Sequence, residues 1–441
     1  MNRSTSIYSF RFILVIFTMI MTSCSVFKKA PAKTDGPPPT LSKPTEEKKA
    51  EEPKKETSKA APFNVAAFGK DVKKDAYNIA VFAPLYLDSV FATSTDIPGR
   101  SMPRYVLPGL EFYEGVQLAL DSLEKQGVKL SVFVYDNKAR QADVPTLIRN
   151  KQLDAMDLII GAVSTPELKQ LSDFSKEKEI NFVSASYPND GGITDNPFLL
   201  ITNSTLKSHC EAIQNYVQKG FTNRNVLIVR RNNSFEAKLA EDLIAANEKM
   251  AYDKKSRIRE VIWSDATPES ELSKYLLTDR PNLCIVTALD ETGARSIVRK
   301  FATLATTYPI QVFGMPTWDV MKFKEPEYSG VTLYYSTPYF NDKTDSFSKY
   351  ISEYFRKNYK SRPSDMAFKG FEYTWYFVKL LQQDGMYFNK NLNREPLRMY
   401  TQFNFQPVYI KEGAETPSYF ENKNVYIIQK GDSADYRMNA L

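Results

Sequence analysis

The sequence predicts an α/β protein built from two doubly wound, Rossmann-like lobes. From residue 77 onward, short apolar runs alternate with longer segments whose apolar residues recur at helical spacing. Strands and helices that alternate in this way form parallel sheets covered by helices on both faces. The alternation pauses at 196–205 and then restarts, which indicates a second lobe. The 441 residues also exceed the roughly 100–150 residues of a common domain.

The first lobe is expected to open with a strand at 79–84 and a helix at 110–126, because Phe112, Val116 and Leu123 share one face of that helix. Its further expected elements are strands at 128–135, 157–161 and 181–184 and helices at 144–153 and 166–176. The elements expected in the second lobe are strands at 226–230, 258–263, 283–287 and 310–314 and helices at 206–219, 235–249, 269–277 and 291–304. Each lobe therefore repeats a strand–helix unit.

Residues 1–23 are predicted to be a lipoprotein signal peptide. Two arginines precede an apolar run at 12–21, which would span about 15 Å as a helix and is too short for a membrane core of about 30 Å. The small residues before Cys24 resemble the lipobox of bacterial lipoproteins. This resemblance implies cleavage before Cys24 and diacylation of its thiol. A plain signal peptide followed by an incidental cysteine is the alternative.

Residues 24–75 are predicted to be a disordered, lipid-anchored tether. The segment 28–60 holds nine Lys, six acidic residues and six Pro, with Leu41 as its one large apolar residue, so it cannot bury a core. The net charge of the chain is +6. The tether segment carries +3 and the signal peptide +2, which leaves +1 for residues 61–441. A nearly neutral body argues against a nucleic-acid partner.

The histidine and cysteine content limits the chemistry. The single histidine, His209, is expected at the surface of a helix, and we expect no metal site, no cofactor and no catalytic residue. Cys210 and Cys284 are expected to be two separate buried thiols, with a disulfide as the alternative. A hydrolase with paired carboxylates stays open as a class, although no such pair stands out. The sequence therefore favours a protein that is not an enzyme.

Hydroxyl side chains follow two of the predicted strands. Ser164 and Thr165 come after one strand, and Ser184 and Ser186 stand at and beyond the end of the next. Ligands of open α/β sheets bind beyond the carboxyl ends of the strands, where helix N-termini present backbone N–H groups. These four residues are therefore candidate ligand contacts. Simple capping of the following helices is the alternative.

Several stretches resemble type I periplasmic binding proteins, in particular the leucine/isoleucine/valine-binding branch. They are Gly-Val-Gln-Leu-Ala-Leu-Asp at 115–121, Val-Tyr-Asp at 134–136, Leu-Ile-Ile-Gly at 158–161, Val-Ser-Ala-Ser-Tyr-Pro at 183–188, and the segments 347–363 and 371–381. The resemblance extends over 77–429 and implies two lobes joined by three crossings. The implied crossings lie near 202–205, 334–337 and 401–404. The implied division is 76–203 plus 336–402 for lobe one and 204–335 plus 403–435 for lobe two.

The resemblance also suggests roles for the hydroxyl residues. Ser164 or Thr165 would receive the carboxylate of a ligand beside a helix N-terminus, and Ser186 would assist. The backbone carbonyl of Ser184 would accept the ammonium of the ligand. The acidic residue that the family places after the first crossing is missing, since Asn-Ser-Thr-Leu stands at 203–206. An unpaired ammonium would be costly, so the ligand need not be a free amino acid.

The contacts from lobe two are expected to come from four residues. These are Arg231, Asn232, Asp290 and Trp318. Tyr187 and Trp318 would sandwich an apolar or planar part of the ligand. Arg231 would pair a second acidic group, which favours a dicarboxylate or a peptide fragment over leucine. A solvated loop around Arg231 is the alternative.

Two functions follow as expectations. The first is a lipid-anchored periplasmic solute-binding protein that captures a small polar, amino-acid-like or peptide-like ligand between its lobes, for an ABC importer or for sensing. Its partners would be the ligand, the membrane through the lipid anchor, and an ABC permease. The alternative is a regulatory lipoprotein with a degenerate pocket, similar to penicillin-binding-protein activators, whose partner is a cell-wall synthase. Either protein is expected on the periplasmic face of the outer membrane.

Overall fold

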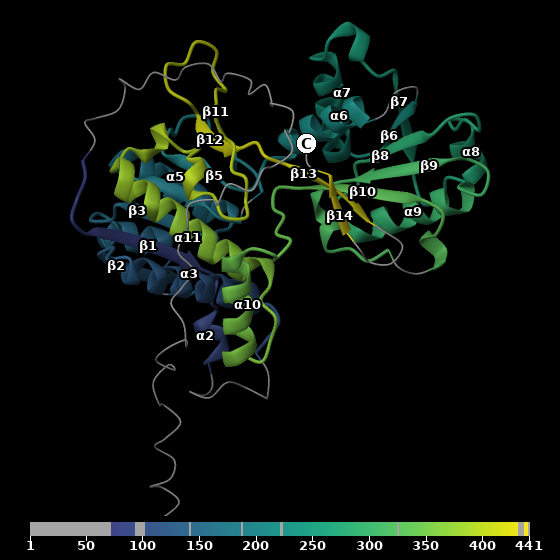
Figure 1. Cartoon of the computed structure of the whole chain (residues 1–441). Coiled ribbons are helices and arrows are strands. Elements are labelled where there is room, and N and C mark those ends of the chain that lie inside the picture. The colour runs from purple at the N-terminus through teal and green to yellow at the C-terminus, as the bar shows by residue number, and fades with distance from the viewer. Residues whose placement is uncertain are drawn as a thin grey trace, which may run out of the picture.

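The computed structural model describes residues 72–92, 102–140, 143–186, 188–220, 224–323, 326–430 and 436–439. These residues fold into two α/β lobes, each built on one seven-stranded sheet (Figure 1). The predicted signal peptide, Cys24 and nearly all of the predicted tether lie outside the described residues, as does Tyr187. In the described part of the chain, no helix combines the length and the apolar character needed to cross a membrane.

The sheet of lobe one has the strand order β11-β12-β5-β4-β3-β1-β2. Its strands are β1 (Tyr77–Ala83), β2 (Leu130–Asp136), β3 (Leu158–Gly161), β4 (Asn181–Ser184), β5 (Leu199–Ile201), β11 (Phe405–Val408) and β12 (Tyr419–Asn422). The six strands from β12 to β2 run parallel, and β11 pairs antiparallel with β12. β1 is fully buried from Ile79 to Ala83, as an apolar strand covered on both faces requires.

Helices cover both faces of this sheet. The helices of lobe one are α2 (Leu87–Val90), α3 (Leu107–Lys125), α4 (Val144–Arg149), α5 (Thr165–Lys178), α10 (Ser346–Asn358) and α11 (Asp365–Asp384), with short 3-10 helices η6 (Phe388–Lys390) and η7 (Glu395–Leu397). α3, α10 and α11 share one hydrophobic core with β1 (Figure 1), while α4 and α5 pack on the opposite face. Gly115 and Gly370 let α3 and α11 touch: a Cβ on Gly370 would lie 2.1 Å from the carbonyl oxygen of Phe112.

The sheet of lobe two has the order β14-β13-β10-β9-β8-β6-β7. Its strands are β6 (Asn225–Arg231), β7 (Ile258–Trp263), β8 (Asn282–Val286), β9 (Ile310–Gly314), β10 (Thr332–Thr337), β13 (Tyr426–Lys430) and β14 (Tyr436–Asn439). Its helices are α6 (Leu206–Gly220), α7 (Ser234–Glu248), α8 (Glu269–Ser273) and α9 (Glu291–Leu304), with 3-10 helices η3 (Tyr252–Lys254), η4 (Pro316–Asp319) and η5 (Pro326–Tyr328). The five strands from β10 to β7 run parallel. The prediction of two doubly wound α/β lobes is thus confirmed.

The third crossing lies later in the chain than 401–404. The expected division puts β11 and β12 in lobe two, but they complete the sheet of lobe one, and the chain crosses between Asn422 and Tyr426. The reason is packing, because Phe405 and Phe420 are buried in the lobe-one core. The short strand β5 falls within the stretch where the sequence pattern pauses.

His209 is not a surface residue. It is 1% exposed, and its Nδ1 lies 2.9 Å from the Oγ of Ser336. Burial lowers the pKa of His209 to about 3, so its ring is neutral. Cys210 and Cys284 are both free and buried, as expected.

Candidate functional site

The register of the lobe-one sheet brings the predicted hydroxyl residues to one edge. Gly161 at the end of β3 pairs with Ser184 at the end of β4. Ser164 and Thr165 therefore start α5 beside the loop that carries Ser186. We call this edge the lobe-one rim, and it comprises Asn137, Lys138, Ser164, Thr165, Glu167, Ser184 and Ser186.

The first turn of α5 satisfies two of its own N–H donors. The N–H of Ser164 donates to Glu167 Oε2 at 2.6 Å, and the N–H of Glu167 donates back to the Ser164 side chain in a capping box. Pro166 has no N–H to offer. The helix N-terminus that was expected to hold a ligand carboxylate thus already holds the carboxylate of Glu167.

The charge of Glu167 is balanced within the same rim. Lys138 Nζ lies 2.9 Å from Glu167 Oε1, and Asn137 Nδ2 donates to Glu167 Oε2 at 2.9 Å. Asn137 Nδ2 also donates to the carbonyl oxygen of Ala162 at 3.1 Å, which fixes its orientation. An incoming anion would therefore compete with Glu167 for Lys138 and for the helix N-terminus.

Two backbone carbonyls of this rim accept hydrogen bonds from residues of the first crossing between the lobes. The carbonyl oxygen of Ser184 accepts from Thr202 Oγ1 at 2.8 Å, and that of Ser186 accepts from Asn203 Nδ2 at 2.7 Å. The Ser184 carbonyl was expected to accept a ligand ammonium, but Thr202 fills that role here. In contrast, the Ser184 hydroxyl is buried and has no hydrogen-bond partner among the described residues.

The lobe-two rim lies at the ends of β6 and β8 and comprises Arg231, Asn232, Asn233, Glu236 and Asp290. Arg231 Nε donates to Glu236 Oε1 at 2.5 Å, and the guanidinium also pairs with Asp290. Burial opposes protonation of Arg231, but its bonds to Asp290 and Glu236 prevail and raise its pKa. Arg231 therefore already has two carboxylate partners, and a second acidic group of a ligand would have to displace one of them. Asn232 is exposed.

The two rims share one local design. In each, the glutamate at the third position of a helix pairs with a basic residue at or just beyond the end of a strand: Glu167 pairs with Lys138, and Glu236 pairs with Arg231. Each rim thereby neutralises its main charges internally. Within the described ranges, no group of three or more His, Cys, Asp or Glu side chains could hold a metal ion.

Trp318 belongs to the core of lobe two. It is 1% exposed, its Nε1 donates to the carbonyl oxygen of Ala288 at 2.8 Å, and its ring fills the space beside Gly314. The expected sandwich of a ligand between Tyr187 and Trp318 is therefore corrected for Trp318, which presents no ring face to a ligand. The position of Tyr187 lies outside the described residues.

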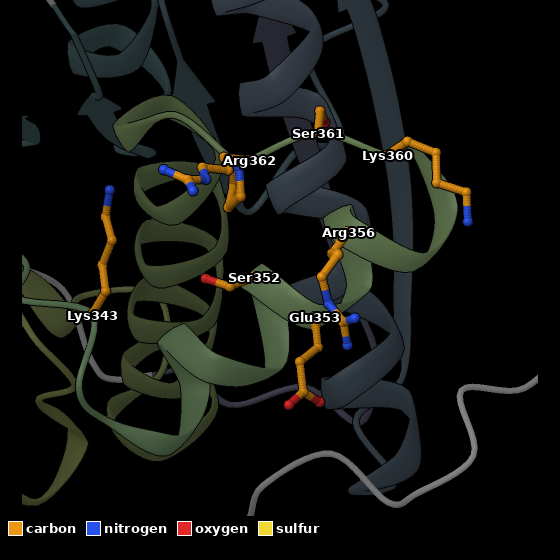
Figure 2. Close-up of a pocket in the computed structure, with 8 residues that line it drawn as sticks. Lys343, Ser352, Glu353, Arg356, Lys360, Ser361 and Arg362 are labelled. Carbon is orange, nitrogen blue, oxygen red and sulfur yellow. The ribbon is translucent and has the colours of Figure 1, made fainter.

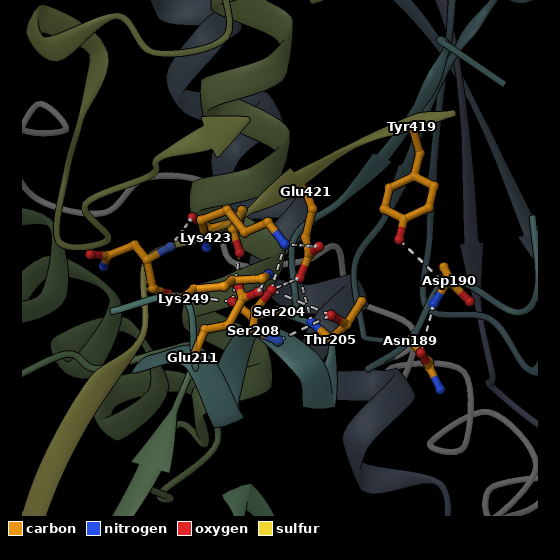
Figure 3. Close-up of polar contacts among 12 residues, drawn as sticks. Asn189, Asp190, Ser204, Thr205, Ser208, Glu211, Lys249, Tyr419, Glu421 and Lys423 are labelled. Carbon is orange, nitrogen blue, oxygen red and sulfur yellow. Dashed lines mark hydrogen bonds and ion pairs between the residues drawn. The ribbon is translucent and has the colours of Figure 1, made fainter. Parts of the chain in front are cut away.

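A polar cluster ties the first crossing to the third (Figure 3). Glu421 on β12 accepts from the N–H of Thr205 at 2.7 Å and from Ser208 Oγ at 2.6 Å, and Lys423 Nζ lies 2.6 Å from its other oxygen. Ser204 Oγ also donates to the carbonyl oxygen of Asn422 at 2.6 Å. We call Ser204, Thr205, Ser208, Glu421 and Lys423 the hinge cluster. It joins a strand of lobe one to the start of a lobe-two helix.

The acidic members of these networks, Glu167, Glu236 and Glu421, are not among the residues predicted from the sequence. Ser-Thr-Pro-Glu at 164–167 matches the capping-box pattern, so Glu167 carried a local signal. Glu236 stands three residues after Asn233, whose side chain caps α7 by accepting from the N–H of Glu236. No such local pattern marks Glu421, because the two residues that donate to it from the first crossing and α6, Thr205 and Ser208, are 216 and 213 residues away along the chain.

Comparisons with solved structures place this fold among binding proteins of ABC transporters. An ABC transporter substrate-binding protein from Desulfitobacterium hafniense, in complex with Leu, is 15% identical, with 83% of this chain and 100% of that chain covered and a TM-score of 0.53. One from Sphaerobacter thermophilus is 14% identical, with 83% and 97% covered and a TM-score of 0.52. An ABC-type branched-chain amino acid transporter from Rhodopseudomonas palustris is 12% identical, with 83% and 95% covered and a TM-score of 0.57. At such identities the likeness concerns the fold.

The sequence itself matches a family model. The model described as "Periplasmic binding protein" matches residues 107–398, which is most of both lobes. No curated protein matches the chain. The family consists of solute-binding proteins and not of enzymes. The two-lobed fold and this match lead to one conclusion: the chain belongs to the periplasmic binding protein family.

Proposed function

We propose that this protein is a solute-binding protein of the cell envelope that captures a small polar ligand between its two rims, for an ABC importer or for sensing. The family match over 107–398 is the observation that carries this proposal. The solved relatives support it, since one is an ABC transporter substrate-binding protein in complex with Leu. The ligand is amino-acid-like or peptide-like, and no cofactor takes part.

The lobe-one contacts in this proposal are Ser164, Thr165, Ser184 and Ser186. The unpartnered, buried hydroxyl of Ser184 supports a role for this edge, because a buried hydroxyl without a partner is costly and a ligand could satisfy it. The lobe-two contacts are Arg231, Asn232 and Asp290. Since both rims are internally paired, a neutral or zwitterionic ligand requires less rearrangement than a dicarboxylate.

A ligand screen followed by calorimetry tests this function. Thermal unfolding of the chain would be measured with amino acids, short peptides and cell-wall fragments, since a ligand of the folded state raises the midpoint. Once a ligand is identified, the double variant Ser164→Ala with Thr165→Ala should weaken its binding by about 1–3 kcal/mol. The matched control is Thr303→Ala with Thr306→Ala, two exposed residues in the last turn of α9 and just beyond it, away from both rims. Equal affinity of the rim variant and the control would disprove the proposed site.

The second candidate is a regulatory lipoprotein whose pocket no longer binds a solute and whose partner is a cell-wall synthase. The internal pairing of both rims is the observation that favours it, because donors and charges that a ligand would use have partners within the protein. A broad screen without any ligand, together with saturable binding of a purified cell-wall synthase to the chain, would support this function. Ligand binding without synthase binding would exclude it.

We also propose that the protein is anchored by lipid at Cys24 and faces the periplasm from the outer membrane. The Lys-, Glu- and Pro-rich composition of the segment 28–60 supports a tether that holds the lobes away from the bilayer. Two or more acyl chains give stable anchoring where a single chain does not.

A further inference from the structure

A basic groove runs along the end of α10 in lobe one, outside both rims (Figure 2). We call it the α10 groove. It has a volume of about 720 Å³ and is lined by the cations Lys343, Arg356, Lys360 and Arg362 and by the hydroxyls of Ser352 and Ser361. Its size falls within the usual 300–1,000 Å³ of small-molecule sites. The groove therefore has the dimensions of a site for a discrete ligand.

The charge of the groove is unbalanced. The lining contains four cations and a single carboxylate, Glu353, although residues 61–441 together carry only +1. One further carboxylate, Asp365, lies 3.5 Å from Lys343 Nζ. Counting both acids, the groove keeps a surplus of two positive charges, which matches a ligand with two negative charges.

Helix capping explains only part of this cluster. Lys360 Nζ donates to the carbonyl oxygen of Lys357 at 3.0 Å, and Arg356 stands in the last turn of α10, where a cation is favourable. Arg362 and Lys343 lie outside the helix, and Figure 2 shows both side chains on the same side of α10 as Ser352. Arg362 is exposed. Capping of α10 thus does not account for the charges of Arg362 and Lys343.

Two lysines of the groove also have unfavourable backbone conformations. Lys343 has a φ of 61° and Lys360 a φ of 52°, in the left-handed region that favours glycine. A side chain in this region costs roughly 1–2 kcal/mol, and strained residues cluster at sites that clamp ligands. The groove therefore keeps charged side chains at two positions where glycine would be more stable.

We propose that the α10 groove binds a phosphate group that carries two negative charges, either free or on a lipid headgroup. One guanidinium group can donate two parallel hydrogen bonds to the oxygens of a phosphate, and Arg356 and Arg362 supply two guanidinium groups. The hydroxyl of Ser352 supplies a further donor, which suits the three terminal oxygens of a phosphate better than the two oxygens of a carboxylate. The surplus of two charges matches a phosphomonoester, and a diphosphate presents a similar terminal phosphate group.

Calorimetry on the full chain with inorganic pyrophosphate tests the site. The variant is Arg356→Gln with Arg362→Gln. The matched control is Lys169→Gln with Arg257→Gln, which removes the same charge at positions outside the groove. We expect saturable binding with one site per chain, weakened at least about tenfold in the groove variant and unchanged in the control. No saturable binding, or an equal loss in both variants, would overturn the proposal.

Two further measurements define the ligand class and its source. Citrate, a tricarboxylate, should compete poorly with pyrophosphate, and equal competition would overturn the assignment to phosphate. Sedimentation with vesicles of phosphatidylcholine with and without phosphatidic acid then separates the sources. Stronger binding of the control than of the groove variant to the phosphatidic acid vesicles would support a headgroup. Equal vesicle binding with pyrophosphate binding intact would support a free phosphate ligand.

Discussion

The carboxylate of Glu421 accepts a hydrogen bond from the backbone N–H of Thr205 at 2.7 Å. Glu421 stands on β12 in the sheet of lobe one, and Thr205 immediately precedes α6 of lobe two. A carboxylate of one lobe therefore caps a helix of the other, at the favourable N-terminal end of its dipole. Glu421 is 1% exposed and Lys423 balances its charge, so this contact couples the two lobes at the hinge.

We predict that Glu421→Gln loosens this coupling. The variant keeps the shape of the side chain but loses the ion pair with Lys423 and the charge-assisted bonds to Thr205 and Ser208. Hydrogen bonds to charged groups contribute about 1.5–3 kcal/mol, so the free energy of unfolding should fall by about that amount. Urea unfolding followed by circular dichroism measures it.

The matched control for the hinge is Glu415→Gln, since Glu415 is exposed and lies between β11 and β12. It should change the free energy of unfolding by less than about 0.5 kcal/mol. If both variants unfold at the same urea concentration as the unchanged chain, the hinge cluster does not couple the lobes.

The hinge also contains a residue, Glu421, whose burial could not be predicted from the sequence. β1 and β8 were predictable because their apolar runs have no charged interruption, and α3 was predictable from its helical spacing. β12 reads Tyr-Phe-Glu-Asn, and a charged residue in a short strand indicates exposure unless distant partners are known. Two of the partners of Glu421, Thr205 and Ser208, come from the start of α6, so only the folded chain identifies it as a buried residue.

For the lobe-one rim, the types of residue could be predicted from the sequence, but their hydrogen bonds could not. Hydroxyls after β3 and β4 follow from strand positions in the sequence, and the register of the sheet brings them together. The hydrogen bonds to the backbone carbonyls of Ser184 and Ser186 do not follow, because Thr202 and Asn203 reach the rim from the first crossing. The burial of Trp318 could not be predicted either, since it depends on the missing side chain of Gly314.

We predict that Gly370→Ala destabilises lobe one. A Cβ on Gly370 would lie 2.1 Å from the carbonyl oxygen of Phe112, so α3 and α11 would have to separate. Alanine favours a helix by up to about 1 kcal/mol over glycine, but overpacking costs typically about 1–3 kcal/mol. The steric cost should prevail and lower the midpoint of thermal unfolding.

Gly192→Ala separates this steric effect from backbone strain. Gly192 has a φ of 77°, and an added methyl group would meet no atom within 4 Å, so alanine there costs only the conformational penalty of about 1–2 kcal/mol. Replacing Phe112 by Ala would not relieve Gly370→Ala, because the clash involves the backbone of α3. Unchanged thermal unfolding of Gly370→Ala would contradict the close helix contact.

We predict that Cys24→Ala releases the protein from the membrane fraction while the lobes stay folded. The proposed diacylated thiol is the anchor, and the described helices include none that could cross a membrane. The measurement is fractionation after a high-salt wash, with immunodetection of the chain. Cys210→Ala, at a buried thiol, is the matched control and should stay in the membrane fraction. A Cys24→Ala chain that still sediments with membranes would rule out the lipid anchor.

Two buried groups, Glu372 and His209, make the free energy of unfolding depend on pH in opposite directions. Glu372 is fully buried, and burial raises its pKa to about 8 despite bonds from the N–H of Thr401 at 2.8 Å and its Oγ1 at 2.5 Å. The contribution of Glu372 is complete below its ordinary pKa of 4.5 and is lost as the pH rises towards 8. For His209, with a pKa lowered to about 3, the contribution is complete above pH 6.5 and is lost as the pH falls towards 3.

Above pH 6.5 the free energy of unfolding still depends on pH through Glu372, whereas the stabilising contribution of His209 is already complete. We predict that the free energy of unfolding falls by roughly 2 kcal/mol between pH 6.5 and 8, and that Glu372→Gln abolishes this fall. Urea unfolding at several pH values measures it, with the exposed Glu412→Gln as the control. An equally steep fall in Glu372→Gln would show that Glu372 ionises normally in the folded chain.

Between pH 4.5 and 6.5 the stabilising contribution of Glu372 falls with rising pH, while that of His209 rises. The sum of the two contributions should therefore be nearly constant in this window. We predict that His209→Gln removes the compensating rise, because glutamine can still bond to Ser336 but takes up no proton. Relative to the unchanged chain, the stability of His209→Gln should then fall with rising pH from 4.5 onward, by up to roughly 3 kcal/mol at pH 6.5. The double variant with Glu372→Gln should show a flat profile in this window, since neither group then titrates. If the difference between His209→Gln and the unchanged chain stays constant across this window, His209 does not change its protonation on unfolding, and its burial cannot have lowered its pKa.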